Sequence, residues 1–365
     1  MKTLGLLFQA FFAILNILFG GTLILAGFAG SFSPEESVIM PYLGLAFPFF
    51  LIVNILFLFY WLIRKQWLFC LISLLALGAS WNAISRYCPY HSRTAIENKK
   101  TIKVLTYNVM GFAFRDHTAK IKNPILTYIA DSKADIVCLQ EYWTHNSCEN
   151  LCDEKIKGAL SMYPYRKLAL YREGHRTKSG LAIYSKFPLS NEKYLRFKDS
   201  GNGLMSCEIN INGKKFFIVN CHLQSFQLTS LDKEKYKKIV TDFAFDNLNE
   251  VKTEVNQKFI PTFKQRAHQA EYVHSIIEKV KQPYIIICGD FNDTPLSYTH
   301  TTVQGDLTDA FMASGKGFGA SYNQNKYYFR IDNILNSKNI TPYNCTVGNK
   351  KYSDHYPMWC NMEIH

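Results

Sequence analysis

Charged side chains are scarce in the first quarter of this 365-residue chain. Residues 1–90 contain four cations and two anions, although the whole chain has 41 lysines and arginines and 29 aspartates and glutamates. This scarcity excludes an ordinary water-soluble domain here, because about a quarter of the residues in such domains are charged. Nearly all of the net charge of +12 therefore lies after residue 90.

Three apolar runs fill the region that lacks charge, at about 4–29, 42–63 and 67–84. The first two exceed the roughly 20 residues that cross a bilayer as a helix, and the third is near the lower end of that range. A cleaved signal peptide is excluded for the first run, because the apolar part of a signal spans only about 7–15 residues. The sequence predicts a membrane region at residues 1–90 with three transmembrane helices.

The few charges between these runs predict how the chain crosses the membrane. Glu35 and Glu36 lie between the first two runs, whereas Arg64 and Lys65 lie between the second and third. The positive-inside rule places Arg64 and Lys65 in the cytoplasm. Three crossings then leave residues 91–365 outside, although several cations just after the third run weigh against this. We expect an integral protein of a bacterial inner membrane with its C-terminal part in the periplasm.

Closely spaced cysteine pairs that would indicate a zinc framework are absent among the ten cysteines. Cys148 and Cys152 would come within disulfide range if one helical turn separates them. Cys345 and Cys360 are a second conceivable pair. The cysteines therefore leave the redox compartment open.

The remainder of the chain has the pattern of one mixed domain. Residues 91–100 are polar and are predicted to form a linker, and residues 101–365 alternate between strand-like and helix-like segments. Asn212-Gly213 separates two apolar runs and is the favoured pair for a tight hairpin turn. Mixed strands, helices and hairpins predict an α/β or α+β sandwich.

Two groups of basic or titratable residues match no motif. Residues 166–178 are rich in arginine and lysine and are interpreted as a solvated loop, with a phosphate-contacting loop as the alternative. Eight histidines are expected at the surface: His91, His117, His145, His175, His268, His274, His300 and His365.

Polar side chains stand where apolar runs end. The clearest case is the run from Tyr284 to Cys288, which ends in Gly289, Asp290, Phe291 and Asn292. A strand that is buried on both faces has such an unbroken apolar run. Asp290 and Asn292 are two residues apart, so they point the same way on a strand. A carboxylate beside an amide suits a site for a hard cation and a phosphate oxygen.

The same arrangement recurs along the domain, in motifs whose order resembles the endonuclease/exonuclease/phosphatase superfamily. DNase I, abasic-site endonucleases, neutral sphingomyelinases and inositol polyphosphate 5-phosphatases are branches of that superfamily. The resemblance covers about residues 100–365. It rests on Tyr107-Asn108, Leu139-Gln140-Glu141, Ser179–Ser185, Asn220-Cys221-His222, Gly289-Asp290-Phe291-Asn292, Arg330-Ile331-Asp332 and Ser353-Asp354-His355.

The resemblance implies a DNase I-like four-layer α/β/β/α sandwich with a phosphoester-hydrolysing site at one rim of two packed sheets. It implies Mg²⁺ as the cofactor, with Mn²⁺ as the alternative. Glu141 matches the principal metal ligand, Asn108 beside it is also assigned to the metal site, and Asp354 would support the metal or the water.

The resemblance also assigns expected catalytic roles to five residues. Asp290 would orient or deprotonate the attacking water, and Asn292 would bind a phosphate oxygen. Asp332 and His355 would form a carboxylate–imidazole pair. His222 matches the histidine of the DNase and sphingomyelinase branches. A histidine held by a carboxylate keeps one tautomer and exchanges protons near neutral pH.

The combined expectation is a membrane-tethered, Mg²⁺-dependent phosphoester hydrolase with no evident obligate protein partner. Its partners would be the bilayer and a phosphoester, which is a lipid headgroup, a nucleic acid or a small molecule. A nuclease is the first alternative, because basic domains attract phosphate backbones. A non-catalytic binding module on the same fold is the second. A transporter is disfavoured, since the three runs contain no charged residues that would line a pathway.

Overall fold

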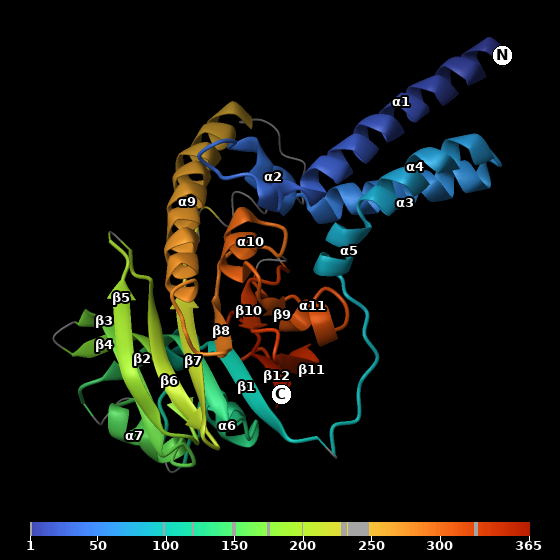
Figure 1. The fold of residues 1–365 in the computed structure, drawn as a ribbon. Coiled ribbons are helices and arrows are strands. Elements are labelled where there is room, and N and C mark those ends of the chain that lie inside the picture. The colour runs from blue at the N-terminus through green and yellow to red at the C-terminus, as the bar shows by residue number, and fades with distance from the viewer. Residues whose placement is uncertain are drawn as a thin grey trace.

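The computed structural model describes most of the chain and groups it into a helical anchor region and a two-sheet domain (Figure 1). The described residues are 2–97, 99–118, 120–147, 151–173, 176–198, 200–227, 232, 248–324 and 328–365. The anchor region is the part before residue 88. Its elements are α1 (Lys2–Gly27), η1 (Ala29–Ser31), α2 (Ile39–Leu45), α3 (Phe47–Ile63), α4 (Trp67–Ala79) and α5 (Trp81–Tyr87).

One helix of the described residues is long and apolar enough by itself to cross a membrane, over Gly5–Gly27. The pairs α2–α3 and α4–α5 are each bent by 59° at a short break. Each pair passes the same test only if it is counted as a single span, so the number of crossings is one to three. The expected second and third runs are thus broken helices, with Ala46 and Ser80 at the breaks.

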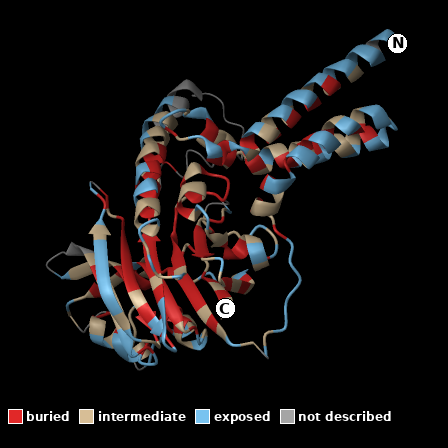
Figure 2. Cartoon of the chain, viewed as in Figure 1, coloured by how far each residue is buried: buried red, intermediate tan, exposed pale blue. Residues whose placement is uncertain are grey.

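Buried polar side chains join the long helices of the anchor region. Asn16 on α1 bonds the hydroxyl of Ser73 on α4, and its carbonyl oxygen accepts from the indole of Trp61 on α3. Large apolar side chains point outward from the same helices, and Figure 2 shows these exposed faces. Helices in lipid associate through such interhelical hydrogen bonds while exposing apolar surface. The exposed apolar faces therefore suit a hydrocarbon environment.

The two-sheet domain contains two six-stranded sheets and their covering helices. The first sheet has the order β11-β12-β1-β2-β4-β3 and the second has the order β5-β6-β7-β8-β10-β9. The strands are β1 (Thr101–Asn108), β2 (Ile136–His145), β3 (Tyr165–Glu173), β4 (Thr177–Ser185), β5 (Leu189–Arg196), β6 (Gly203–Ile211), β7 (Lys214–His222), β8 (Tyr284–Asp290), β9 (Thr308–Asp309), β10 (Asp332–Asn336), β11 (Ile340–Val347) and β12 (Met358–Ile364). The helices are η2 (Met110–Phe114), α6 (Pro124–Asp131), α7 (Asp153–Ala159), α9 (Leu248–Ile277), α10 (Tyr298–Gln304) and α11 (Ala310–Ser314).

Neighbouring residues on each central strand face different cores. Val104 and Ile218 lie in the core between the sheets, whereas Leu105 packs under α6 and α7 on the far side of the first sheet. Val219 packs under α9 and α10 on the far side of the second sheet. Successive side chains of a strand point to opposite faces. This explains the unbroken apolar runs and gives a helix–sheet–sheet–helix arrangement.

Several expectations need correction. Residues 166–173 and 177–178 lie in β3 and β4, so the basic segment is a hairpin of two paired strands and not a solvated loop. His300 is fully buried, because it faces the carboxylate of Asp309 inside the domain. Cys345 and Cys360 are free and buried, and Cys148 lies outside the described residues.

Candidate active site

Two parallel strand pairs bring the candidate residues to one rim of the sandwich. In the first sheet β1 and β2 pair in parallel, with Asn108 opposite Gln140. In the second sheet β7 and β8 pair in parallel, with His222 opposite Asp290. The carboxyl ends of parallel strands meet at one edge of a sheet, which is where such folds place ligands. Asn108 and Asp290, which are 182 positions apart in sequence, therefore come into contact.

Asp290 is the centre of the arrangement. It is 1% exposed, and its Oδ2 accepts a hydrogen bond of 3.1 Å from the side-chain amide of Asn108. The same Oδ2 lies 3.6 Å from Nε2 of His222 and 3.6 Å from Nε2 of His355. Its Oδ1 accepts from the backbone N–H of Asn292 at 2.8 Å. One buried carboxylate thus faces two imidazoles.

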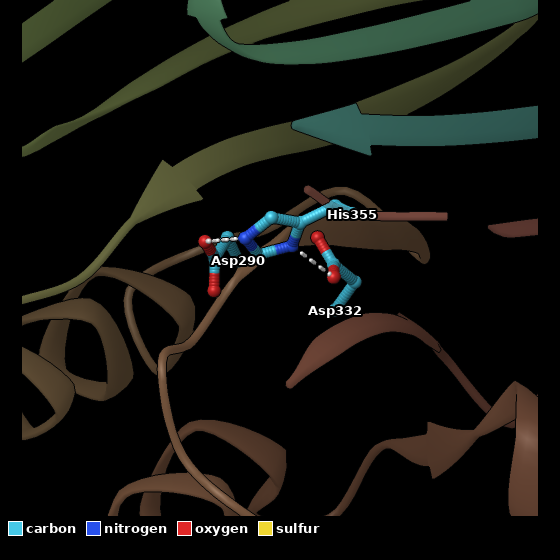
Figure 3. A group of neighbouring side chains, drawn as sticks. All are labelled: Asp290, Asp332 and His355. Atoms are coloured by element: carbon cyan, nitrogen blue, oxygen red, sulfur yellow. Dashed lines mark hydrogen bonds and ion pairs between the residues drawn. The ribbon is translucent and has the colours of Figure 1, made fainter. Parts of the chain in front are cut away.

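His355 is held by a second carboxylate. Its Nδ1 and Oδ2 of Asp332 are 2.7 Å apart, and both residues are buried. Figure 3 shows the imidazole between Asp332 on one side and Asp290 on the other. Such a bond fixes the tautomer and the ring orientation of a histidine. The other oxygen of Asp332, Oδ1, is buried and has no hydrogen-bond partner among the described residues.

The pKa values of His355, Asp290 and Asp354 are all raised, but by different causes. Burial alone would lower the pKa of His355, but the charges of Asp332 and Asp290 raise it well above its ordinary value. Burial raises the pKa of Asp290, and the charge of Asp332 adds to that rise. Burial also raises the pKa of Asp354, with further increases from Glu141 and Asp290. The charges of the neighbouring carboxylates thus favour the protonated form of His355.

Glu141 reaches the site from a bulge in β2. The register with β4 shifts between Leu139 and Tyr142, and Glu141 there has φ of 52°. Its Oε1 accepts from the amide of Asn108 at 3.1 Å and lies 3.9 Å from Nε2 of His222. A left-handed conformation costs a residue other than glycine about 1–2 kcal/mol. In this strained conformation, the carboxylate of Glu141 is 44% exposed and lies beside the buried carboxylate of Asp290.

The other two predicted residues lie beside this centre. Asn292 also has a left-handed φ, of 54°, and its amide donates to the carbonyl of Leu223 at 3.0 Å. Asp354 accepts from the hydroxyl of Ser353 at 3.2 Å, and that hydroxyl also bonds the backbone carbonyl of Asn108. The last strand connection is thereby tied to the end of β1.

The donor set fits a hard divalent cation. Carboxylate oxygens of Asp290 and Asp332 and a ring nitrogen of His355 lie within 4.8 Å of one another, but a protonated His355 cannot ligate a cation, so the carboxylates are the candidate ligands. Glu141 and Asp354 add carboxylate oxygens, and oxygen ligands are what Mg²⁺ prefers. Burial is the main cause of the raised pKa values of Asp290 and Asp354, and neighbouring carboxylates add to the rise, so a cation would stabilise their charged forms. The carbonyl oxygen of Asn108 accepts from the N–H of Met110, so this side chain holds two carboxylates through its amide nitrogen.

Two features of the site escaped sequence reasoning. Gln140 and Asn220 form a buried amide pair of 2.6 Å that links the two sheets directly behind the site. Phe114 is 69% exposed and contacts the ring of Trp143, two residues beyond Glu141, with ring centroids 5.8 Å apart. The run from Met110 to Phe114 has positive φ at every residue, from 45° to 60°. Only the glycine in that run signalled such a turn.

Replacing Glu141 by glycine is expected to separate the effect of the backbone strain on stability from the effect of the carboxylate on activity. Glycine adopts a left-handed φ without penalty, so the free energy of unfolding should stay equal or rise by up to about 1 kcal/mol. Phosphoester turnover should fall, because the exposed carboxylate is lost. Denaturant unfolding and a hydrolysis assay measure the two effects. Asn212→Gly is the matched control, because Asn212 has the same φ of 52° in a hairpin turn, and it should keep full activity. A large loss of stability in Glu141→Gly would contradict the interpretation that Glu141 is strained.

Two known family models match this chain. A sequence model of the Endonuclease/Exonuclease/phosphatase family matches residues 105–355. A second model, described as a domain of unknown function (DUF8431), matches residues 9–87. No curated protein sequence matches the chain significantly.

Solved structures show the same fold. An endonuclease/exonuclease/phosphatase from Bacteroides vulgatus is 17% identical, with a TM-score of 0.50, and the match covers 73% of this chain and 100% of that one. One from Beutenbergia cavernae is 13% identical, with a TM-score of 0.50, and covers 72% of each chain. The human Nocturnin catalytic domain is 16% identical with a TM-score of 0.49, covering 73% of this chain and 96% of that one.

Proposed function

Because the chain belongs to the endonuclease/exonuclease/phosphatase family, we propose that it is a membrane-tethered hydrolase of phosphoester bonds that depends on Mg²⁺, or on Mn²⁺ in its place. The observation that carries the proposal is the position of Asp290. Its carboxylate faces His222 and His355 at 3.6 Å each, beside Asn108 and close to Glu141. Buried acids and bases held this close are typical of catalytic sites.

Each residue of the site has a separate role in the proposed hydrolysis. Asp332 fixes Nδ1 of His355, and Nε2, which lies 3.6 Å from Asp290, would contact a phosphoester oxygen as an imidazolium. Asp290 orients the attacking water and takes its proton, and Asn292 binds a non-bridging oxygen. A divalent cation, bound through Glu141 with Asp354 nearby, would supply neutralisation of the charge that develops on the phosphoryl oxygens. Each positioned proton transfer contributes about 10²–10⁴-fold to the rate.

The anchor region supports membrane attachment through three spans. α1 is long enough to cross, and the broken pairs α2–α3 and α4–α5 would complete the second and third crossings. Arg64 and Lys65 lie at the turn between α3 and α4, whereas Glu35 contacts the two-sheet domain at the other end. The positive-inside rule favours placing that domain on the periplasmic side of a bacterial inner membrane.

A nuclease is the second candidate function. The observation that favours it is the net positive charge of residues 91–365, which suits a polyanionic backbone. The same charge also suits anionic lipids, so it does not separate the two substrates.

The first test is hydrolysis of bis-p-nitrophenyl phosphate by the full chain in detergent. We expect turnover with Mg²⁺ or Mn²⁺ and a loss of about 10²-fold or more in Glu141→Gln, because the exposed carboxylate is the main cation ligand. Glu192→Gln, on the edge strand β5 and paired with Lys167, is the control and should keep wild-type turnover. Equal turnover in all three proteins would refute the proposed function.

A further inference from the structure

The anchor region contacts the two-sheet domain at the loop that follows the candidate catalytic residues. Leu296, four residues after Asn292, is 1% exposed and lies in one apolar cluster with Leu23, Phe47 and Tyr87. These three residues come from α1, from the start of α3 and from the end of α5. The loop after β8 therefore packs against one end of the helical bundle. In Figure 1, α10 lies between β8 and α2.

Gly30 marks the closest approach between the two regions. A Cβ atom at this position would lie 3.0 Å from the carbonyl oxygen of Leu296 and 3.1 Å from that of Ser297. It would also meet the hydroxyl of Thr301 on α10. Such spacing leaves no room for a side chain, so the anchor backbone packs directly on the loop after the site.

Polar contacts also join the anchor region to α9 of the two-sheet domain. Glu35 bonds Lys264 at 2.7 Å and lies 3.2 Å from His268, both on α9. The hydroxyl of Tyr42 on α2 donates to Asn256 at 2.8 Å. These contacts lie on the helix that covers the second sheet, so the anchor touches two elements of the catalytic domain.

A second connection runs from the anchor to the strand that carries Asp332. The guanidinium of Arg330, which is buried, donates to the backbone carbonyl of Arg86 at 2.7 Å. Arg86 in turn donates to Gln304 on α10 at 3.0 Å. Arg330 is two residues before Asp332, so their Cα atoms are at most about 7 Å apart.

These connections limit the distance between the candidate site and the anchor region. Leu296 is four positions after Asn292, and an extended chain spans about 14 Å at most over that length. A headgroup layer is roughly 5–8 Å thick on each side of the hydrocarbon. The candidate site therefore lies within about two headgroup thicknesses of its contact with the anchor.

We propose that this docking holds the site at the bilayer surface and that the substrate is a phospholipid of the membrane that carries the enzyme. The proposal rests on the phosphoester hydrolysis proposed above. Water adds its oxygen to phosphorus, the bond from phosphorus to an alcohol oxygen breaks, and the leaving alcohol takes the proton. One product stays in the bilayer, and the other is water-soluble and leaves the membrane. No oxidant or second substrate is required.

The experiment uses the full chain reconstituted into vesicles of phosphatidylethanolamine and phosphatidylglycerol, with release of water-soluble phosphorus or headgroup as the readout. Labelled lipid is placed either in the same vesicles or in separate vesicles. Plasmid DNA and bis-p-nitrophenyl phosphate are offered in parallel. We expect release from the host vesicles and about 10²-fold slower release from separate vesicles, since a shared bilayer raises the effective concentration.

Gly30→Val is the variant that tests the docking itself. Its side chain would push the anchor away from Leu296, so the preference for lipid in the same vesicles should fall toward one. Turnover of bis-p-nitrophenyl phosphate should remain. Gly21→Val is the matched control, because a Cβ at Gly21 meets nothing within 4 Å among the described residues. It should behave as the wild type.

The outcomes separate the two proposals. Normal turnover of bis-p-nitrophenyl phosphate without lipid release, equal release from both vesicle populations, or faster cleavage of plasmid DNA would overturn the membrane-lipid inference and leave the hydrolase standing. A Gly30→Val protein with an unchanged lipid preference would also overturn it. No turnover of any phosphoester would overturn the proposed function and the inference together.

Discussion

Replacing Asp290 by asparagine is expected to lower the turnover of bis-p-nitrophenyl phosphate by about 10²–10⁴-fold, the usual contribution of a positioned proton acceptor. The amide has the same shape but cannot take a proton from water. In the wild type, an oxygen of Asp290 faces the amide nitrogen of Asn108 and Nε2 of His355. The asparagine side chain would turn its NH₂ group toward one of these nitrogens. The loss should appear in kcat rather than in KM, because the group acts in the transition state.

The same substitution should leave stability unchanged or higher. Burial raises the pKa of Asp290, so its folded-state pKa lies above the unfolded value. The stabilisation linked to that shift is present below the unfolded pKa and is lost as the pH rises through the folded pKa. At pH 7 the carboxylate therefore contributes no stability through this shift. Parallel unfolding curves and hydrolysis rates measure both effects.

Asp116→Asn is the control for this experiment. Asp116 pairs with Lys155 at 3.1 Å on a partly exposed loop after η2, and such ion pairs contribute about 0–1 kcal/mol. It should keep wild-type turnover. An Asp290→Asn protein with near-normal turnover would remove Asp290 from the chemistry. An unfolded variant would instead show that the carboxylate is structural.

Replacing Asp309 by alanine is expected to cost about 3–5 kcal/mol of unfolding free energy, as the loss of one partner of a buried ion pair does. Asp309 accepts from Arg330 at 2.9 Å and lies 3.1 Å from Nε2 of His300, and all three side chains are buried. Its other oxygen accepts from the N–H groups of Phe311 and Met312 and so begins α11. Alanine would leave an unpaired guanidinium inside the domain.

The pH dependence of unfolding should follow the same group. Burial raises the pKa of Asp309, but Arg330 and His300 lower it more, so the net pKa is well below its ordinary value. Burial lowers the pKa of His300. A depressed pKa contributes stability above the unfolded value, and that stability is lost as the pH falls. The contribution of this cluster to the unfolding free energy should therefore decrease from about pH 6.5 downward through His300, and further below about pH 3.9 through Asp309.

Asp306→Ala is the matched control, because Asp306 is exposed in the same connection and substitutions at such positions change stability by about 0.5 kcal/mol at most. Chemical denaturation of the full chain in detergent at several pH values makes the measurement. A loss below about 1 kcal/mol in Asp309→Ala would mean that water replaces the carboxylate at Arg330.

The strand ends could be predicted from the sequence because their pattern is local. An apolar run that stops at Asp290, or at His222, indicates a buried strand and its terminal polar group without knowledge of the partner strand. The topology then brings them together, since parallel strands end at one rim. The pairing of Asp332 with His355 followed from the resemblance, and the distance of 2.7 Å agrees with it.

The rest depended on contacts between distant segments. The backbone packing of Gly30 on Leu296 joins residues far apart in sequence, and no periodic pattern signals such a contact. His300 was expected at the surface because a single histidine has no visible partner, and its carboxylate partner becomes apparent only in three dimensions. The left-handed φ of Glu141 was equally hidden, since glutamate rarely adopts it.

The most direct test of the proposed hydrolase is the rate of bis-p-nitrophenyl phosphate hydrolysis by the full chain before chelation, after chelation and after Mg²⁺ is added back. The account predicts that chelation abolishes turnover, that Mg²⁺ restores it, and that the restored rate is absent from Asp290→Asn. Turnover that persists through chelation, or that returns equally in Asp290→Asn, would contradict it.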